Sequence, residues 1–89
     1  MQTNFAKKFK KQYEKADTKI KAAFDKKLEL FLQEPFYPLL NNHSLTGQYL
    51  GKRSINITDD WRAIFSETEN EEEKVINFEL LDTHSNLYK

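Results

Sequence analysis

The sequence contains no cysteine, and its 89 residues include only two glycines, two prolines and two histidines. The lack of cysteine excludes disulfide bonds, thiolate nucleophiles and cysteine metal sites. The low glycine and proline content, with 38% hydrophobic and 31% charged residues, is typical of a globular chain and not of a disordered or fibrous one. We therefore expect one domain spanning residues 1–89, built around a single core.

Long hydrophobic segments are also missing. No run approaches the roughly 20 residues that a membrane-spanning helix needs, and Met1 to Phe5 lack the apolar segment of a signal peptide. A cytoplasmic protein without membrane contacts is therefore expected. The two histidines and the scattered carboxylates lack the local spacing of a zinc site, so we expect neither a metal nor another cofactor.

The formal net charge is zero, but the charges are unevenly distributed. Residues 1–34 contain nine lysines and five acidic residues, whereas residues 66–89 contain seven acidic residues and two lysines. The N-terminal part could therefore meet a polyanion, because the field of a local patch steers a charged partner more than the total charge does. The alternative is that these lysines only solvate the outer faces of helices.

Two N-terminal segments carry apolar residues at helical spacing. The first predicted helix extends from about Asn4 to Lys15. The second starts after Asp17 or Thr18, either of which can cap it, and ends before Pro35. Since few residues separate the two helices, we expect them to form an antiparallel hairpin.

Alternation of apolar and polar residues predicts strands over residues 53–58, 61–67 and 74–81. The like-charged segment from Glu67 to Glu73 is expected to be a solvated hairpin tip. Together these elements predict an α+β fold, with an N-terminal antiparallel helical hairpin packed on a small, mainly antiparallel sheet of three or four strands. The second face of this sheet would then be free to bind another molecule.

The two histidines, His43 and His84, are candidates for acid–base chemistry. They lie about forty residues apart and flank the predicted sheet in the sequence. If the fold brings them to one sheet face, they form a pair suited to general acid–base catalysis. The alternative for each ring taken singly is a surface or hydrogen-bonding role.

The segment Asp59-Asp60-Trp61-Arg62 lies at the corner between two predicted strands. Asp59 and Asp60 can form the turn, or one of them can orient a histidine or act as a base. Trp61 can belong to the core or stack on a substrate. Arg62, like Arg53 on the preceding strand, suits a scissile phosphate, because its planar fork holds two oxygens and offsets charge that develops in the transition state.

Several motifs give the chain a resemblance to a known family. The segments Gly51 to Thr58, Asp60 to Phe65 and Thr83 to Tyr88 resemble the RelE superfamily of type II toxins, and within it the YafQ-like branch. The likeness includes Leu45-Thr46-Gly47 and the preceding helical region with His43, so it covers nearly the whole chain.

This resemblance implies a small α+β fold and a ribosome-dependent endoribonuclease that cleaves mRNA in the ribosomal A site without a metal. In such enzymes the 2′-hydroxyl of the nucleotide attacks the adjacent phosphate and leaves a 2′,3′-cyclic phosphate and a 5′-hydroxyl. A partner antitoxin would hold the toxin inactive. The lysine-rich helices would contact 16S ribosomal RNA, and operator DNA would be bound only through the antitoxin.

The resemblance also implies roles for seven residues, and the amide of Asn56 makes that residue a further substrate-binding candidate. The acid–base candidates are His43, Asp60 and His84. The substrate-binding candidates, of which the two arginines would contact phosphate, are Arg53, Asn56, Trp61, Arg62 and Tyr88.

Three features depart from the pattern of these relatives. Asn56 stands where the YafQ branch has a histidine, and an amide cannot replace an imidazole in proton transfer, although it can hydrogen-bond a phosphate or a ribose. Ser54 stands where an acid is common. The strand that many relatives place before the first helix is expected to be almost absent, because only Met1 to Asn4 precede that helix.

Two other functions are compatible with the sequence. A relative of the same fold could have lost the chemistry and act as a binding module, or inhibit another target, as the ParE branch acts on DNA topology enzymes. Asn56 favours this hypothesis, whereas His43, Asp60 and His84 favour the enzyme. The lysine-rich helices could also belong to a general RNA- or protein-binding domain, whose binding would depend steeply on salt.

Overall fold

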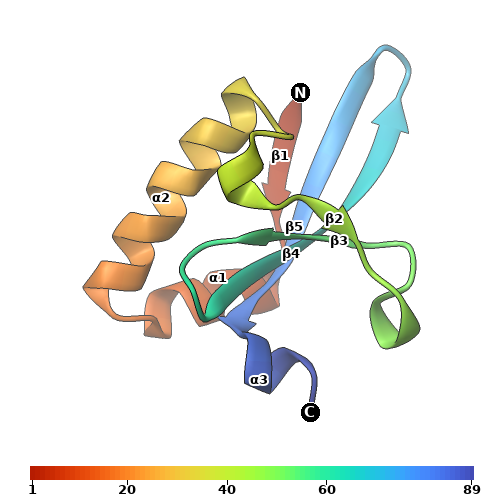
Figure 1. Cartoon of the computed structure of the whole chain (residues 1–89). Coiled ribbons are helices and arrows are strands. Elements are labelled where there is room, and N and C mark those ends of the chain that lie inside the picture. Colours follow the sequence, from red (N-terminus) through yellow and green to blue (C-terminus); the bar gives the residue numbers. More distant parts are fainter.

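Two helices follow a short N-terminal strand, and the rest of the chain forms most of a five-stranded sheet (Figure 1). This computed structural model describes all residues from Met1 to Lys89. The strands are β1 (Gln2–Phe5), β2 (His43–Ser44), β3 (Arg53–Asn56), β4 (Trp61–Asn70) and β5 (Glu73–Thr83). The helices are α1 (Lys7–Lys15), α2 (Thr18–Gln33) and the short α3 (His84–Leu87), with 3-10 turns at Pro38–Leu40 and Gly47–Tyr49. The predicted α+β class is therefore confirmed.

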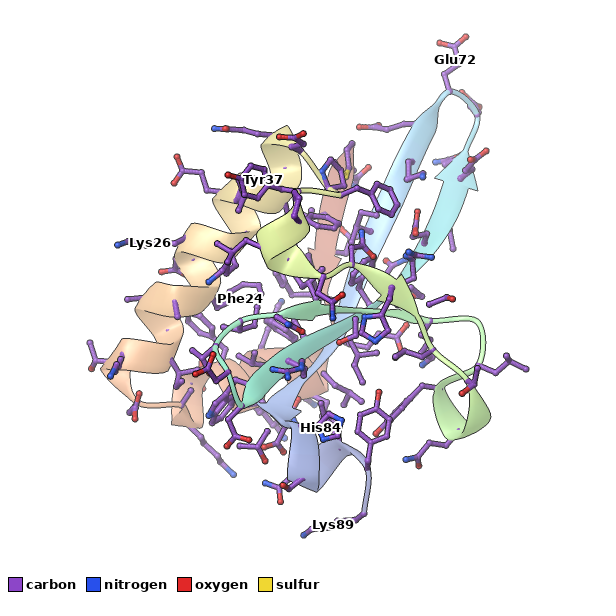
Figure 2. All side chains as sticks on the ribbon, viewed as in Figure 1. Phe24, Lys26, Tyr37, Glu72, His84 and Lys89 are labelled. Carbon is purple, nitrogen blue, oxygen red and sulfur yellow. The ribbon has the colours of Figure 1, made fainter.

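The sheet has the strand order β1-β5-β4-β3-β2. Only β1 lies parallel to its neighbour, and the other three pairs are antiparallel. β4 and β5 form a long hairpin, and the acidic side chains of its tip are exposed, with Glu72 at the outermost point (Figure 2). The sheet is mainly antiparallel, as predicted, but it has five strands and not three or four, because β1 and β2 also pair into it.

β1 overlaps the start of the helix predicted from about Asn4. It pairs in register with β5, so that Phe5 lies opposite Phe78 and their rings stack with centroids 5.6 Å apart. The prediction of a helix from Asn4 and the prediction that the first strand is almost absent are both wrong. The four-residue spacing from Phe5 to Phe9 fits a strand–helix junction as well as a helix, because both rings reach the same core in either case.

The second helix follows its sequence signals. The carboxylate of Asp17 accepts a hydrogen bond from the backbone N–H of Ile20 at 2.9 Å, as an N-cap does, and α2 ends at Gln33, before Pro35. The two helices do not form a clear antiparallel hairpin, since their far ends lie well apart in Figure 1. No helix is both long and apolar enough to cross a membrane.

The main core fills the space between these helices and one face of the sheet. Phe24, which Figure 2 shows between α2 and the sheet, meets the ring of Phe78 edge to face at 5.6 Å, and Phe9 from α1 lies 5.1 Å from Phe24. Burying a side chain of this size contributes about 1.5–3 kcal/mol relative to leaving it exposed. Aromatic packing on β5 therefore fixes the sheet face that the helices cover.

The opposite face of the sheet is covered only in part. Leu45 and Leu87 pack on Ile64 in a small second cluster. The hydroxyl of Tyr49 donates to the carbonyl of Leu87 at 2.7 Å and so ties the Gly47–Tyr49 turn to α3. These contacts pin the C-terminal segment to the body of the protein.

Candidate active site

A polar recess of about 210 Å³ opens on the sheet face that α1 and α2 leave free. The alternation of β3 explains its position, because Ile55 and Ile57 point into the main core and Ser54 and Asn56 point the other way. Four parts of the chain supply the lining, which consists of Asn41, His43, Ser54, Asn56, Arg62, His84 and Tyr88. The fold therefore brings both histidines of the chain to one site.

Two larger recesses lie elsewhere on the molecule. One of about 510 Å³ follows β1 and β5, and one of about 400 Å³ lies between α1 and α2. Neither is lined by a histidine or an arginine. The smaller recess is therefore the better candidate for acid–base chemistry on an anionic substrate.

His43 enters the recess from β2, a two-residue edge strand that pairs with Ser54 and Arg53 of β3. Its Nδ1 lies 2.8 Å from the carbonyl oxygen of Asn41. A carbonyl can only accept a hydrogen bond, so Nδ1 carries a proton and donates it. In the neutral ring the lone pair is then on Nε2, which is the atom that can take a proton from a substrate.

His84 is the first residue of α3, and Figure 2 shows its side chain projecting from that helix. Its backbone N–H donates to the carbonyl of Asp60 at 2.8 Å, which fastens the start of α3 to the corner between β3 and β4. Thr83 caps α3 through its hydroxyl, which accepts from the N–H of Asn86 at 3.2 Å. The backbone that carries the ring of His84 is therefore held in place.

Tyr88 packs against His84, with ring centroids 4.7 Å apart, and meets Tyr49 edge to face at 5.5 Å. Burial raises the pKa of the Tyr88 hydroxyl, the neighbouring Tyr49 raises it further and Arg62 opposes the shift. Tyr88 therefore stays protonated across the physiological range and can donate a hydrogen bond.

Arg62 folds its guanidinium onto the corner that precedes it. Its Nη1 donates to the carbonyls of Thr58 at 2.8 Å and Trp61 at 3.0 Å, and its Nη2 donates to the carbonyl of Asp59 at 3.1 Å. These acceptors are neutral, and Arg62 forms no ion pair. Its charge is therefore available to an anion in the recess.

Asn56 holds the one buried side-chain polar atom that has no hydrogen-bond partner, namely its Oδ1. Leaving such a group unpaired costs about 1–3 kcal/mol. The neighbouring Ser54 is 2% exposed and is the single buried polar side chain of the chain. The floor of the recess is thus polar and incompletely satisfied, as expected of a site that binds a polar substrate.

Three of the predicted site residues do not line the recess. Trp61 packs against the main core. Arg53 donates from Nε to Oδ1 of Asn42 at 2.8 Å, on the sheet face that carries Ile55. The side chain of Asp60 is exposed at the corner, and its contact with the site is the backbone carbonyl that holds His84.

Two residues of the recess, Ser54 and Asn41, are not among the predicted site residues. Asn41 ends the Pro38–Leu40 turn in the left-handed conformation, with φ 47° and ψ 48°, and its carbonyl binds His43. Asparagine tolerates this conformation better than most residues, so the pair Asn41-Asn42 before a histidine is a sequence signal for such a turn. Nowhere in the structure do three or more His, Cys, Asp or Glu side chains gather as metal ligands would.

The fold is shared with small bacterial toxins of known structure. The YoeB/ParE toxin from Agrobacterium tumefaciens superimposes with a TM-score of 0.76 at 18% identity, over 94% of this chain and 99% of that one. YafQ from E. coli strain BL21(DE3) superimposes with a TM-score of 0.74 at 19% identity, over 98% and 97% of the two chains. YafQ in the E. coli DinJ-YafQ complex gives a TM-score of 0.64 at 22% identity, over 98% and 97%. At such low identity these likenesses establish the fold alone.

The sequence itself identifies the family. The family described as the bacterial toxin of type II toxin-antitoxin system, YafQ, matches residues 1–89. The chain therefore belongs to the YafQ family of type II toxin–antitoxin toxins, which confirms the predicted resemblance. None of the curated proteins matches the chain.

Proposed function

We propose that this toxin is a ribosome-dependent endoribonuclease that cleaves mRNA in the A site without a metal. The observation that carries the proposal is that His43 and His84, about forty residues apart in the sequence, line one recess together with Arg62. Two imidazoles beside a guanidinium can supply the base, the acid and the charge stabilisation for an attack of a 2′-hydroxyl on the adjacent phosphate.

His43 and His84 divide the proton transfers between them. Nε2 of His43 takes the proton of the 2′-hydroxyl as its oxygen attacks the phosphorus, because Nδ1 already carries a proton. The bond from phosphorus to the 5′-oxygen breaks, and protonated His84 gives that oxygen a proton. The products are a 2′,3′-cyclic phosphate and a 5′-hydroxyl, and each proton is accounted for.

Arg62, Asn56 and Tyr88 bind the reacting nucleotide. The Arg62 guanidinium leaves its neutral carbonyl acceptors for the phosphate, which is the stronger partner. The Asn56 amide hydrogen-bonds the ribose or the phosphate, and the Tyr88 ring next to His84 supports the substrate. Arg53 and Trp61 have no direct contact in this scheme, because the structure holds both away from the recess.

Partners follow from the family. A cognate antitoxin binds the toxin and blocks it, a proposal that the E. coli DinJ-YafQ complex of the relative supports. The exposed lysines of α1, at positions 7, 8, 10 and 11, contact 16S ribosomal RNA, and operator DNA is reached only through the antitoxin. The toxin then acts in the cytoplasm, where ribosomes translate mRNA.

Expression of the chain without an antitoxin tests the proposal in cells. We expect growth arrest with a block in translation, which His43→Ala and His84→Ala each relieve, while Asn70→Ala at the hairpin tip remains toxic. If both histidine variants arrested growth as strongly as the parent at equal protein level, the assignment of the acid and the base would be wrong.

The alternative is a binding module of the same fold that has lost catalysis or inhibits another target, as ParE-type toxins do. Asn56 favours it, because an amide stands in the recess where the YafQ-like pattern has an imidazole. The same expression experiment separates the two proposals. A module of this kind would stop cell division with translation intact, or would allow normal growth.

A further inference from the structure

The segment from Asn41 to Ser44 presents His43 to the recess, and β2 alone does not fix it. β2 pairs with β3 over two residues only. The carbonyl that receives the Nδ1 proton of His43 belongs to Asn41, in its left-handed conformation. This carbonyl is part of the peptide bond that joins Asn41 to Asn42. Whatever holds Asn42 therefore also holds the acceptor for His43.

Asn42 is held from two sides. Its Nδ2 donates to the carbonyl of Pro35 at 3.0 Å, and its Oδ1 accepts from Nε of Arg53 at 2.8 Å. Nη2 of Arg53 also donates to the backbone carbonyl of Asn42, at 3.4 Å. The side-chain amide of Asn42 thus connects Pro35, which follows α2, to Arg53 on β3.

Arg53 is itself fixed by further contacts on the helix side of the sheet. Its guanidinium lies over the ring of Phe36, 5.4 Å from the centroid, and its Nε is 3.7 Å from Oε1 of Glu67. A phosphate in the recess could reach Arg53 only if these contacts and the one to Asn42 were lost. These contacts suit Arg53 to support Asn42, and they do not suit it to bind substrate.

We propose that Asn42 and Arg53 are positioning residues that set the tautomer of His43. They hold the Asn41 carbonyl in place, so that the proton of the neutral ring stays on Nδ1 and Nε2 faces the substrate unprotonated. This inference rests on the proposed role of His43 in mRNA cleavage, but the tautomer is a property of the free protein. It gives Arg53 a part in the reaction without contact to RNA, in contrast to the phosphate contact that the family resemblance implies.

The tautomer is measured directly in protein labelled with ¹⁵N-histidine, by long-range ¹H–¹⁵N correlation on the neutral rings. We expect Nδ1 of His43 to be protonated in the parent protein. In Asn42→Ala and in Arg53→Ala the ¹⁵N chemical shifts of the two His43 ring nitrogens should approach each other, because the proton then redistributes between the nitrogens. His84 serves as the internal reference, and Asn70→Ala should leave both rings unchanged. Circular dichroism and melting temperature show whether each variant has kept its fold.

Cleavage of ribosome-bound mRNA by the same variants gives the functional counterpart. Each single substitution should lower the rate by about tenfold to hundredfold, as expected when a catalytic group is misplaced. The cleavage rate of the double variant Asn42→Ala/Arg53→Ala should be no more than about twofold lower again, because both substitutions remove the same support of the Asn41 carbonyl. If Arg53 instead contacted the phosphate directly, the losses of cleavage rate in the two single variants would multiply in the double variant. The tautomer of His43 would then be unchanged in Arg53→Ala.

Three results decide the matter. A parent His43 protonated on Nε2 overturns the proposal, and so does an unchanged tautomer in a folded Asn42→Ala variant. If the tautomers behave as expected but the parent does not cleave mRNA, the positioning of His43 stands and the proposed function fails.

Discussion

The backbone N–H of His84 donates to the carbonyl of Asp60 at 2.8 Å. This bond joins the corner between β3 and β4 to the first residue of α3, two places that are distant in the sequence. Asp60 thus acts on the recess through its backbone, while its exposed carboxylate does not line the site.

Asp60→Asn separates these two contributions, because it removes the charge and keeps the carbonyl. We expect cleavage to stay within about threefold of the parent, since general acid–base catalysis by a side chain contributes about a hundredfold or more. The measurement is the single-turnover rate on ribosome-bound mRNA. A loss of cleavage rate as large as that of His84→Ala would show that the Asp60 carboxylate has the acid–base role that the family resemblance implies.

Asn56→His introduces an imidazole into the floor of the recess. The Oδ1 of Asn56 is buried without a partner, and an amide cannot transfer a proton. The variant should therefore cleave faster, by about tenfold or more, because it adds a group capable of acid–base work. Asn77→His on the same sheet face, at a distance from the recess lining, is the matched control and should change nothing. No gain in the Asn56 variant would show that the existing pair of histidines already suffices.

Glu79 links stability to pH. Burial tends to raise the pKa of this carboxyl, but hydrogen bonds from Lys52 and Ser66 outweigh it and hold the pKa below its ordinary value. The ordinary pKa of such a carboxyl is 4.5. Because its pKa is lower in the folded state, the ionised carboxyl stabilises the protein at pH values above 4.5, and this contribution to the free energy of unfolding is lost as the pH falls through the lowered pKa.

Urea unfolding at a series of pH values tests this expectation. Glu79→Gln should cost about 1 kcal/mol at neutral pH and should flatten the fall in stability below about pH 5. Glu72→Gln, at the exposed hairpin tip, is the control and should leave the profile unchanged. Equal acid profiles for the parent and Glu79→Gln would contradict the assigned pKa direction.

The lysines of α1 provide a test of ribosome binding. Neutralising Lys7, Lys8, Lys10 and Lys11 to glutamine should weaken binding to ribosomes and reduce the slope of log affinity against log salt, because fewer counterions are released. Replacing the tip acids Glu71, Glu72 and Glu73 by glutamine should leave binding equal or stronger. An unchanged salt slope in the lysine variant would mean that these side chains only solvate the helix.

The sequence predicts much of this fold, because periodicity reports which faces are buried. The stripe of α2 and its Asp17 cap follow from local signals, as do the strands around Ile55 and Phe78. β1 does not, because four residues with a single large apolar side chain carry too little pattern, and its pairing with β5 is a contact distant in sequence. Local propensity cannot report such a contact.

The site shows the same division. Five of the residues proposed for the site from the sequence line one recess, namely His43, Asn56, Arg62, His84 and Tyr88. Arg53 shares a strand face with Ile55, so alternation already indicates the helix side, although both its planar fork and the motif suggest a phosphate contact. Asn41-Asn42 is a sequence signal for a turn, but the direction of the Asn41 carbonyl could not be predicted, because it also depends on contacts of Asn42 with residues elsewhere in the chain.

The most direct test adds the purified toxin to ribosomes stalled on a defined mRNA and maps the new 5′ ends, with His84→Ala in parallel and a related active toxin as control. We expect a cut within the A-site codon, a 5′-hydroxyl on the downstream fragment, and loss of the cut in the His84 variant. Intact mRNA beside an active control, or a cut that His84→Ala makes as fast as the parent, would contradict this expectation.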